Sequence, residues 1–255
     1  MAGMAERALS FGAVAEAYER YRPGYPAELA ERVLDYAGAP VAGALEIGAG
    51  TGKATRLFAG RGIAVTATDP DPAMLAELRK HLPAEVETRR GALEDLRPDR
   101  QYGLVYSAAA LHWTDPDGRW PRIAALLAPA GVFASFGGPL RPADPVVRKA
   151  IDDAQAPFLQ TADVPSPDGT PPEDELQWPG TELEKSELFA DVRQVVVRER
   201  TTVGADDLIG FFSTVSAYLM LPISVREQAF QRIRQVLPDP VELVADHTIH
   251  LARRR

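Results

Sequence analysis

The stretch from Ala44 to Thr55, ALEIGAGTGKAT, decides the fold. Its apolar opening predicts a short buried strand, Ala44 to Ile47, and the glycines that follow predict a tight turn into a helix. Glycine has no Cβ and reaches positive φ, so the backbone of this turn can approach a ligand closely. The next helix directs free N–H groups and the positive end of its dipole at the same place. We therefore expect the turn to hold a polar group, anionic or rich in hydrogen-bond acceptors, at the carboxyl end of a strand.

Two nucleotide-binding patterns fit this stretch incompletely. A P-loop requires G-x-x-x-x-G-K-[ST]; Gly52 and Lys53 match, but Ile47 takes the place of the first glycine and alanine follows the lysine, so this pattern fails. A dinucleotide fingerprint requires G-x-G-x-x-G. Gly48 and Gly50 match, but Lys53 stands where close packing of helix on strand favours Gly or Ala. The dinucleotide interpretation is weakened and stays open.

A third pattern, an acidic residue followed by three glycines at alternate positions, is matched in full by Glu46, Gly48, Gly50 and Gly52. It resembles motif I of the class I S-adenosylmethionine (SAM) dependent methyltransferases. The resemblance implies that these four residues, together with Ala49, line the site of the cofactor SAM and its product S-adenosylhomocysteine (SAH). The alternative is a glycine turn that serves the architecture and binds nothing.

The composition limits the possible functions. The chain has 255 residues, 45% of them hydrophobic, which suffices for a substantial core without cross-links. It has no cysteine, which excludes disulfides, thiolate–metal sites and a thiol nucleophile; we expect no metal. A net charge of −8 argues against a nucleic-acid partner. No apolar run reaches membrane-spanning length and the N-terminus lacks a signal-peptide core, so we expect a cytoplasmic protein with no membrane contact, monomeric or homodimeric.

A second candidate site residue ends the next strand. Ile63 to Thr68 alternates in the manner of a strand and is followed by Asp69, about 20 residues beyond the glycines, where an acidic side chain usually binds a ribose hydroxyl pair. The alternative role for Asp69 is to cap a helix ahead of Pro70. The family resemblance extends the predicted cofactor contacts to Pro70 and Met74.

Two later segments resemble further parts of the same family. The run GALEDL (Gly91 to Leu96) resembles its adenine-contacting loop, with Leu93 offering backbone and Glu94 its carboxylate to the adenine amine. The strand before Ala108 is followed by LHW, a segment that lies beside the methyl group and the substrate entrance in the family. The cofactor-binding residues are thus expected to include Ser107, and the substrate-binding residues Trp113. His112 is the candidate general base or orienting group, because its pKa lies near neutrality; the alternative is a histidine that only supports the motif loop.

The N-terminal run FGAVAEAYERYRPGYP resembles the entry segment of methyltransferases similar to the trans-aconitate and ubiquinone-pathway enzymes. Residues 5–21 are expected to be helical. In the relatives this segment folds over the cofactor as a lid, so Tyr18 and Tyr21 are expected to face SAM and Arg22 to pair with its carboxylate. The alternative is that the tyrosines only pack the helix and that Arg22 is a surface charge.

The second half of the chain departs from simple strand–helix alternation. Prolines cluster between residues 139 and 187, a segment too long for a plain loop and therefore expected to be an insertion or cap over the substrate site. The region 202–221 reads as helical, and its apolar face supplies Phe211, Phe212 and Tyr218 as candidate substrate contacts, with a plain core stripe as the alternative.

Together these elements predict an α/β fold. We expect a Rossmann-like seven-stranded sheet, mostly parallel with an antiparallel last strand, covered by helices on both faces and carrying a helical cap. Residues 1–138 would form the SAM-binding core with an N-terminal lid helix, 139–187 the cap, and 188–255 the strands and helices that complete the domain. This arrangement resembles the methyltransferase sheet over nearly the whole chain.

The predicted activity is methyl transfer from SAM to a small organic acceptor through an oxygen, nitrogen or carbon nucleophile, in biosynthetic or specialised metabolism. Because the donor is already activated, the protein mainly positions the reactants and excludes water, which is consistent with the lack of a catalytic triad in the sequence. Two alternatives remain: an NAD(P)-dependent oxidoreductase on a similar sheet, and a SAM-binding protein without methyl transfer, such as a regulatory binder or a cyclase.

Overall fold

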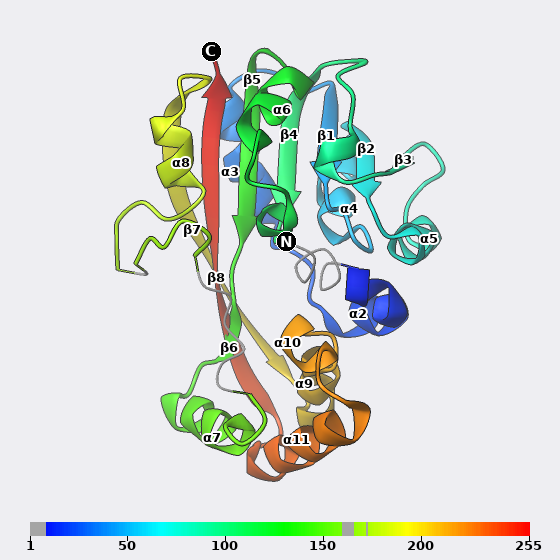
Figure 1. Ribbon diagram of the computed structural model, residues 1–255, viewed down its shortest axis with the longest axis vertical. Coiled ribbons are helices and arrows are strands. Elements are labelled where there is room, and N and C mark those ends of the chain that lie inside the picture. The colour runs from blue at the N-terminus through cyan, green and yellow to red at the C-terminus, as the bar shows by residue number, and fades with distance from the viewer. Residues whose placement is uncertain (1–8, 160–165, 172) are drawn as a thin grey trace. The chain divides into compact units, whose positions relative to one another are not determined.

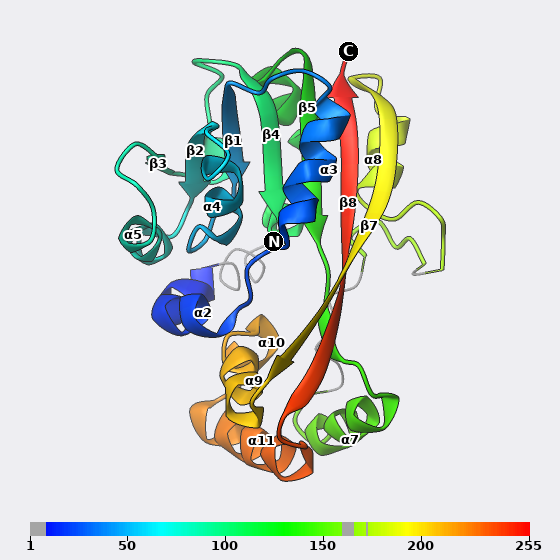
Figure 2. The same cartoon turned by 180° about the vertical axis from the view of Figure 1, so that it is seen from behind.

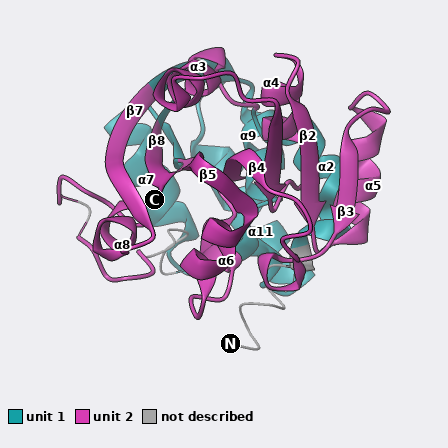
Figure 3. Cartoon of the chain, turned by 90° about the horizontal axis from the view of Figure 1, so that it is seen from above, with its two compact units in different colours: residues 1–23, 138–164, 198–246 teal, residues 24–137, 165–197, 247–255 magenta. Residues whose placement is uncertain are grey.

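The computed structural model describes residues 9–159, 166–171 and 173–255, and the chain divides into two compact units (Figure 3). Unit 1 comprises residues 1–23, 138–164 and 198–246; unit 2 comprises residues 24–137, 165–197 and 247–255. The segment 139–187, expected as one insertion, is thus shared between the two units. The N-terminal helix groups with unit 1, whereas the sequence analysis assigned it to the same part of the chain as the glycine turn.

The strands form one sheet in the order β3-β2-β1-β4-β5-β8-β6, with β7 paired to β8. Strands β1 to β5 run parallel to one another, and β8 is antiparallel to both of its neighbours in this order, β5 and β6. The predicted α/β class, mostly parallel with an antiparallel last strand, is confirmed, and β6 is an additional short strand. The bounds are β1 Gly43–Ile47, β2 Ala64–Asp69, β3 Glu87–Arg90, β4 Tyr102–Ala108, β5 Leu127–Gly137, β6 Leu140–Pro142, β7 Phe189–Val203 and β8 Val241–Arg254.

Helices cover both faces of the unit 2 part of the sheet (Figures 1 and 2). Side chains alternate between the faces along each strand, so Ala44 of β1 packs with α3 (Ala27–Ala37) and α4 (Lys53–Ala59), while Leu45 packs with α6 (Arg119–Leu126) and α8 (Gly180–Lys185). Helix α5 (Pro72–Lys80) begins at Asp71, whose carboxylate accepts the N–H of Ala73 at 2.8 Å. Asp71 thus caps the N-terminus of α5 two residues after β2 ends, at the edge of the sheet formed by the carboxyl ends of the parallel strands.

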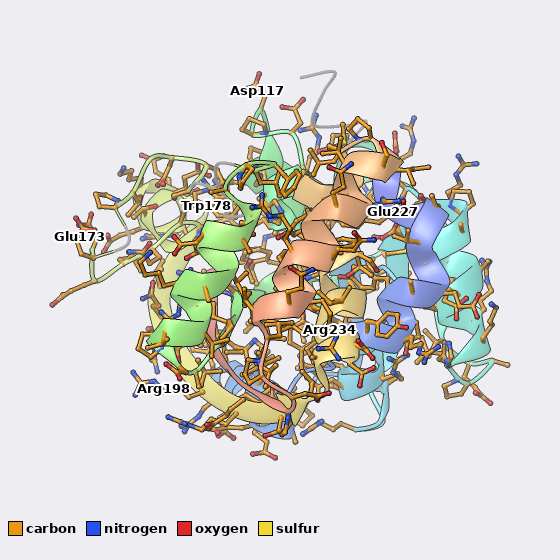
Figure 4. All side chains as sticks on the ribbon, turned by 90° about the horizontal axis from the view of Figure 1, so that it is seen from below. Asp117, Glu173, Trp178, Arg198, Glu227 and Arg234 are labelled. Carbon is orange, nitrogen blue, oxygen red and sulfur yellow. The ribbon has the colours of Figure 1, made fainter. Side chains whose placement is uncertain are left out.

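Unit 1 has its own core, made mostly by helices. It contains a 3₁₀ turn η1 (Leu9–Val14) and the helices α2 (Ala15–Tyr21), α7 (Pro145–Gln155), α9 (Ala205–Phe212), α10 (Ser216–Leu219) and α11 (Ile223–Val236). Their apolar faces meet around Leu208, Tyr218 and Ile233, each exposed by 2% or less. At the surface, Arg234 on α11, labelled in Figure 4, pairs with Asp206 of α9 at 2.6 Å.

Two expected helices differ from the structure. The region expected to be helical from residue 202 begins as strand, because β7 continues to Val203 through β-branched residues that favour extended backbone; α9 starts only after Gly204. Within the expected N-terminal helix, Leu9–Val14 is a 3₁₀ turn and only Ala15–Tyr21 is α-helical, while residues 5–8 lie outside the described residues.

Within the described ranges, no helix combines the length and the apolar character needed to cross a bilayer. The same part of the chain holds no group of three or more histidine or carboxylate side chains arranged to bind a metal ion.

Candidate functional site

The glycine turn follows β1 in the conformation that the sequence indicated. Gly48, Gly50 and Gly52 have φ of +70°, +55° and +84°, which non-glycine residues rarely adopt. A Cβ on Gly48 would lie 2.4 Å from the Cβ of Ala110, and one on Gly52 would lie 2.8 Å from Leu78 Cγ. The turn is therefore packed tightly against the segment after β4 on one side and against α5 on the other, and a side chain at these positions would displace its neighbours.

Asp69 lies at the end of β2, directly beside this turn. Its Oδ2 accepts the N–H of Gly50 and its Oδ1 accepts the N–H of Asp71, both at 2.9 Å. The side chain is buried, and burial raises the pKa of the Asp69 carboxyl to about 6 even though the two backbone bonds favour the charged form. Each carboxylate oxygen can accept a further hydrogen bond, so the group is held in place and retains capacity for a ligand.

Glu46 lies on β1 just before the turn and is only 1% exposed. Its Oε2 accepts the hydroxyls of Thr55 at 2.6 Å and Tyr106 at 2.9 Å, whereas its Oε1, also buried, has no hydrogen-bond partner among the described residues. Burial raises the pKa of the Glu46 carboxyl to about 8, against the effect of the two hydroxyl bonds. A buried oxygen without a partner is costly and needs an explanation, and a ligand that donates to it would supply one.

The other predicted cofactor residues of this unit lie close to the turn. Gly50 and α5 meet at Met74, because a Cβ on the glycine would lie 3.5 Å from Met74 Cε. Ala49 donates its N–H to the Thr68 carbonyl at 2.8 Å, and Pro70 follows Asp69 with its carbonyl accepting from Arg90. These contacts join the glycine turn to the carboxyl end of β2 and to the first turn of α5.

Ser107 is wholly buried in β4, and its hydroxyl donates to the Ile47 carbonyl at 3.0 Å. This bond ties β4 to β1 below the glycine turn. The hydroxyl is thus already engaged within the protein, and the cofactor contact expected at Ser107 stays a prediction.

The two later motifs are connected to each other. Leu93 and Glu94 lie in the 3₁₀ turn η2 (Leu93–Asp95); Leu93 is buried, and Glu94 Oε1 accepts the N–H of Asp115 at 2.6 Å. Asp115 follows η3 (Leu111–Trp113), the LHW segment. The loop that is expected to contact adenine thus bonds directly to the backbone just after the LHW turn.

His112 and Trp113 sit together in η3. Their ring centroids are 4.5 Å apart at an interplanar angle of 47°, and both side chains are half-buried. Leu111 anchors the turn in the core at 2% exposure. The described geometry is compatible with either role considered for the histidine, the base or the support of the motif loop.

The remaining predicted residues belong to unit 1. Arg22 donates to the hydroxyl of Thr214 at 2.8 Å and to its carbonyl at 3.0 Å, and its guanidinium lies over the rings of Phe211 and Tyr18, at 4.5 and 5.2 Å. It therefore has a structural role inside unit 1. A cavity of about 300 Å³ within this unit is lined by Arg22, Phe211 and Tyr21, among others.

The candidate substrate residues Phe212 and Tyr218 are neighbours in the same core, with ring centroids 5.8 Å apart. Tyr218 is wholly buried, and its hydroxyl donates to Gln155 Oε1. Complete burial speaks against a direct substrate contact at Tyr218, since its polar end is already engaged within the protein.

Sequence reasoning missed the residues that hold the site. Thr55 and Tyr106 lie nine and sixty positions from Glu46, and Arg119, which bonds to the residue after the LHW turn, is 2% exposed. No periodicity or short motif relates such positions. One signal was available for Tyr106, which lies inside the mostly apolar run LVYSAAAL, because a polar group in such a run indicates a buried partner.

The sheet is mostly parallel, and a glycine turn and an acidic residue lie at its carboxyl edge. This arrangement is typical of α/β proteins that bind a nucleotide-like cofactor. Comparison with known proteins narrows this class. A family model described as a methyltransferase domain matches residues 44–131. An uncharacterized methyltransferase of Mycobacterium tuberculosis is 32% identical over 232 residues, covering 91% of this chain and 87% of the relative. Trans-aconitate 2-methyltransferase of Methylobacterium nodulans is 36% identical over 119 residues, covering 46% and 44%.

The fold is shared with a solved structure from Anaeromyxobacter dehalogenans, given as a candidate type II methyltransferase. That chain has a TM-score of 0.65 at 23% identity, with coverage of 91% of this chain and 98% of the other. The chain belongs to the class I SAM-dependent methyltransferases.

The residues at the carboxyl edge fit the cofactor of that family. All three glycines of the turn have a positive φ, and Gly48 and Gly52 leave no room for a Cβ, so the turn can present backbone without side chains to a ligand. Asp69 offers acceptor capacity suited to a pair of hydroxyls, and the unpartnered Glu46 oxygen suits a donor. The fit rests on this donor and acceptor set.

Proposed function

We propose that this protein transfers a methyl group from SAM to a small organic acceptor through an oxygen, nitrogen or carbon nucleophile, in biosynthetic or specialised metabolism. The observation that carries the proposal is the hydrogen bond, 2.9 Å long, from the Gly50 N–H in the turn after β1 to the Asp69 carboxylate at the end of the neighbouring β2. It joins an acidic side chain to a positive-φ backbone at the carboxyl edge of the sheet, where α/β proteins bind cofactors. Family membership supports SAM as the donor.

Each cofactor residue then has a specific task. Asp69 accepts from the ribose hydroxyls, the backbone of Leu93 and the carboxylate of Glu94 face the adenine, and the glycine turn approaches the methionine part closely. Bound SAM supplies a methyl group on a sulfonium whose leaving group is a neutral thioether. The protein contributes orientation and the exclusion of water.

For Tyr18, Tyr21 and Arg22, a contact with SAM stays part of the proposal. Arg22 has bonds of its own within unit 1, to Thr214, and these would hold its guanidinium in one orientation. A guanidinium held in this way loses less side-chain entropy when it pairs with a carboxylate.

His112 is the proposed base or orienting group for an acceptor that must lose a proton. Its half-buried position beside Trp113 supports a role that is sensitive to the surroundings of the ring. If the acceptor is already nucleophilic, His112 only orients it.

The acceptor is proposed to contact Trp113, Phe211 and Phe212. The cavity of about 300 Å³ that Phe211 lines within unit 1 is of a size that accepts a small metabolite. Several bacterial relatives are named for trans-aconitate, which makes this compound a rational member of an acceptor panel. Monomeric or homodimeric assembly and a cytoplasmic location are proposed with the same activity.

The test is an assay of SAH release from SAM across a panel of hydroxyl, amine, carboxylate and activated-carbon compounds, with product mass measured for each. Acceptor-dependent SAH release with a mass increase of one methyl group is the expected result, and the Asp69→Ala variant should reduce it. SAM binding without methylation across the whole panel would instead favour a regulatory binder or a cyclase.

A further inference from the structure

Two side chains, Glu94 and Arg119, hydrogen-bond to the residues that directly follow the LHW turn. Glu94 Oε1 accepts the N–H of Asp115 at 2.6 Å, and Arg119 bonds twice to Thr114, the residue between that amide and Trp113. Both contacts lie within unit 2. They act on consecutive residues, so they fix the position and direction of the backbone at the end of the turn.

Arg119 is the first residue of α6 and is only 2% exposed. Its Nε donates to the Thr114 hydroxyl and its Nη2 to the Thr114 carbonyl, both at 2.8 Å. The Thr114 hydroxyl in turn donates to the Leu111 carbonyl at 2.8 Å. One guanidinium therefore bonds directly to Thr114, the residue that follows the turn, and is connected to Leu111, the first residue of the turn, through the Thr114 hydroxyl.

The guanidinium has its own support in α8. Glu182 Oε2 lies 3.4 Å from Arg119 Nη1 and accepts the indole N–H of Trp120 at 2.9 Å. The Trp178 ring lies 5.3 Å from the Arg119 Cζ. Helix α8 is itself packed in the core through the wholly buried Leu183. The charge that holds the turn is thus paired with a carboxylate on a different element.

A buried guanidinium is expensive unless its donors are satisfied. Here Nε, Nη1 and Nη2 each donate to Thr114 or Glu182, so a displacement of Thr114 would leave buried polar groups without partners. A plain packing role would need no such set of charged bonds. The arrangement favours one position of the turn over all others.

We propose that Arg119 is a positioning residue that, together with Glu94 and Glu182, locks the turn carrying His112 and Trp113, and that Glu94 links this turn to cofactor binding. The link follows from the place of Glu94: its Oε1 holds the Asp115 amide, and the same carboxylate is the group proposed above to face the adenine. This inference rests on the proposed function, because the turn matters for methyl transfer only if the glycine site holds SAM.

The first test needs no ligand. Hydrogen exchange measured by mass spectrometry on the full chain should show peptides covering residues 108–117 exchanging about tenfold faster in Arg119→Gln than in wild type. Arg122→Gln is the matched control, since Arg122 lies on the same helix and bonds to the Asp117 carbonyl outside the turn. Should Arg119→Gln fail to fold, Thr114→Val removes the hydroxyl contact and keeps the guanidinium paired with Glu182.

A matched pair at Glu94 tests the link. Glu94→Gln keeps an oxygen that can accept the Asp115 amide, whereas Glu94→Ala removes it. Saturating SAH should shift the NMR signal of the His112 ring in wild type and in Glu94→Gln. The shift should shrink at least threefold in Glu94→Ala, measured at a SAH concentration that saturates the variant.

Unchanged exchange over residues 108–117 in Arg119→Gln and Thr114→Val would overturn the positioning role. An equal His112 shift in both Glu94 variants would overturn the link. Failure of the proposed function is distinguishable, because it appears as an absence of SAH binding by the wild-type protein while the exchange comparison still gives its result.

Discussion

Two polar regions of unit 2, one around Arg119 and one around the glycine turn, differ in how far their buried polar groups are hydrogen-bonded. Around Arg119, charged and hydroxyl groups satisfy one another: the guanidinium has acceptors on Thr114 and Glu182. Around the glycine turn, two buried carboxyls have unused capacity, and burial raises the pKa of both. Satisfied groups hold a geometry, while unsatisfied ones indicate where a ligand belongs. Changes in the first region should therefore affect stability and local order, and changes in the second should affect binding and pH dependence.

The largest expected effect is on the pH dependence at Glu46. Its pKa is about 8 in the folded protein against 4.5 ordinarily, so between these values the folded state binds more protons than the unfolded state and stability falls as pH rises. Glu46→Gln removes this dependence. The variant should gain on wild type by roughly 1.4 kcal/mol per pH unit from about pH 5 to pH 8, on the order of 4 kcal/mol in total.

Urea unfolding of both proteins from pH 5 to pH 9 measures this difference. It should grow with pH and level off above about pH 8. Parallel stability curves would contradict a raised pKa of the Glu46 carboxyl in the folded protein.

The next largest effect is expected at Gly48. Gly48→Ala combines a positive φ with a Cβ only 2.4 Å from Ala110 and should lower the free energy of unfolding by about 3 kcal/mol. Gly62 has a φ of +78° but open space around its Cβ position, so Gly62→Ala should lose only about 1 kcal/mol. Equal losses in denaturant unfolding would show that the close approach at Gly48 does not exist in solution.

A smaller effect concerns ligand affinity at Asp69. Asp69→Ala should weaken SAH binding by about 1–3 kcal/mol, because ribose hydroxyls would lose their acceptor. Asp71→Ala serves as the comparison: it removes the N-cap of α5 and should lower stability by about 1 kcal/mol while SAH affinity stays within about threefold. Calorimetric titration of both variants decides, and unchanged affinity in Asp69→Ala would refute the ribose assignment.

The smallest effect is expected where a polar group is already satisfied inside unit 1. Tyr218→Phe removes one buried bond to Gln155 and should lower the free energy of unfolding by about 1 kcal/mol, with no change in SAH affinity. If the folded variant lost most of its methyl-transfer activity, measured once an acceptor is known, Tyr218 would be assigned to the substrate site after all.

The fold was predictable because each local signal agreed with the others. Three glycines at alternate positions indicated the positive-φ turn, and the alternating run before Asp69 indicated a strand that ends at the carboxylate. The start of α9 was less predictable, because the β-branched Thr202 and Val203 end β7 with only one residue between them and the start of the helix at Ala205.

The connections within the site could not be read from the sequence. Glu94 and Asp115 are 21 positions apart, and Arg119 and Glu182 are 63 apart. Such bonds depend on where the packed elements bring long side chains, and neither periodicity nor motif spacing records this. The sequence thus indicated candidate cofactor residues, but not the residues that hold them in place.

The central claim is that the carboxyl edge beside Gly50 and Asp69 binds an adenosyl cofactor. The most direct test is a calorimetric titration of the purified protein with SAM, SAH, NAD and NADP. Micromolar binding of SAM and SAH, without binding of the two dinucleotides, is the predicted result. Binding of NAD or NADP instead, or of none of the four, would contradict it.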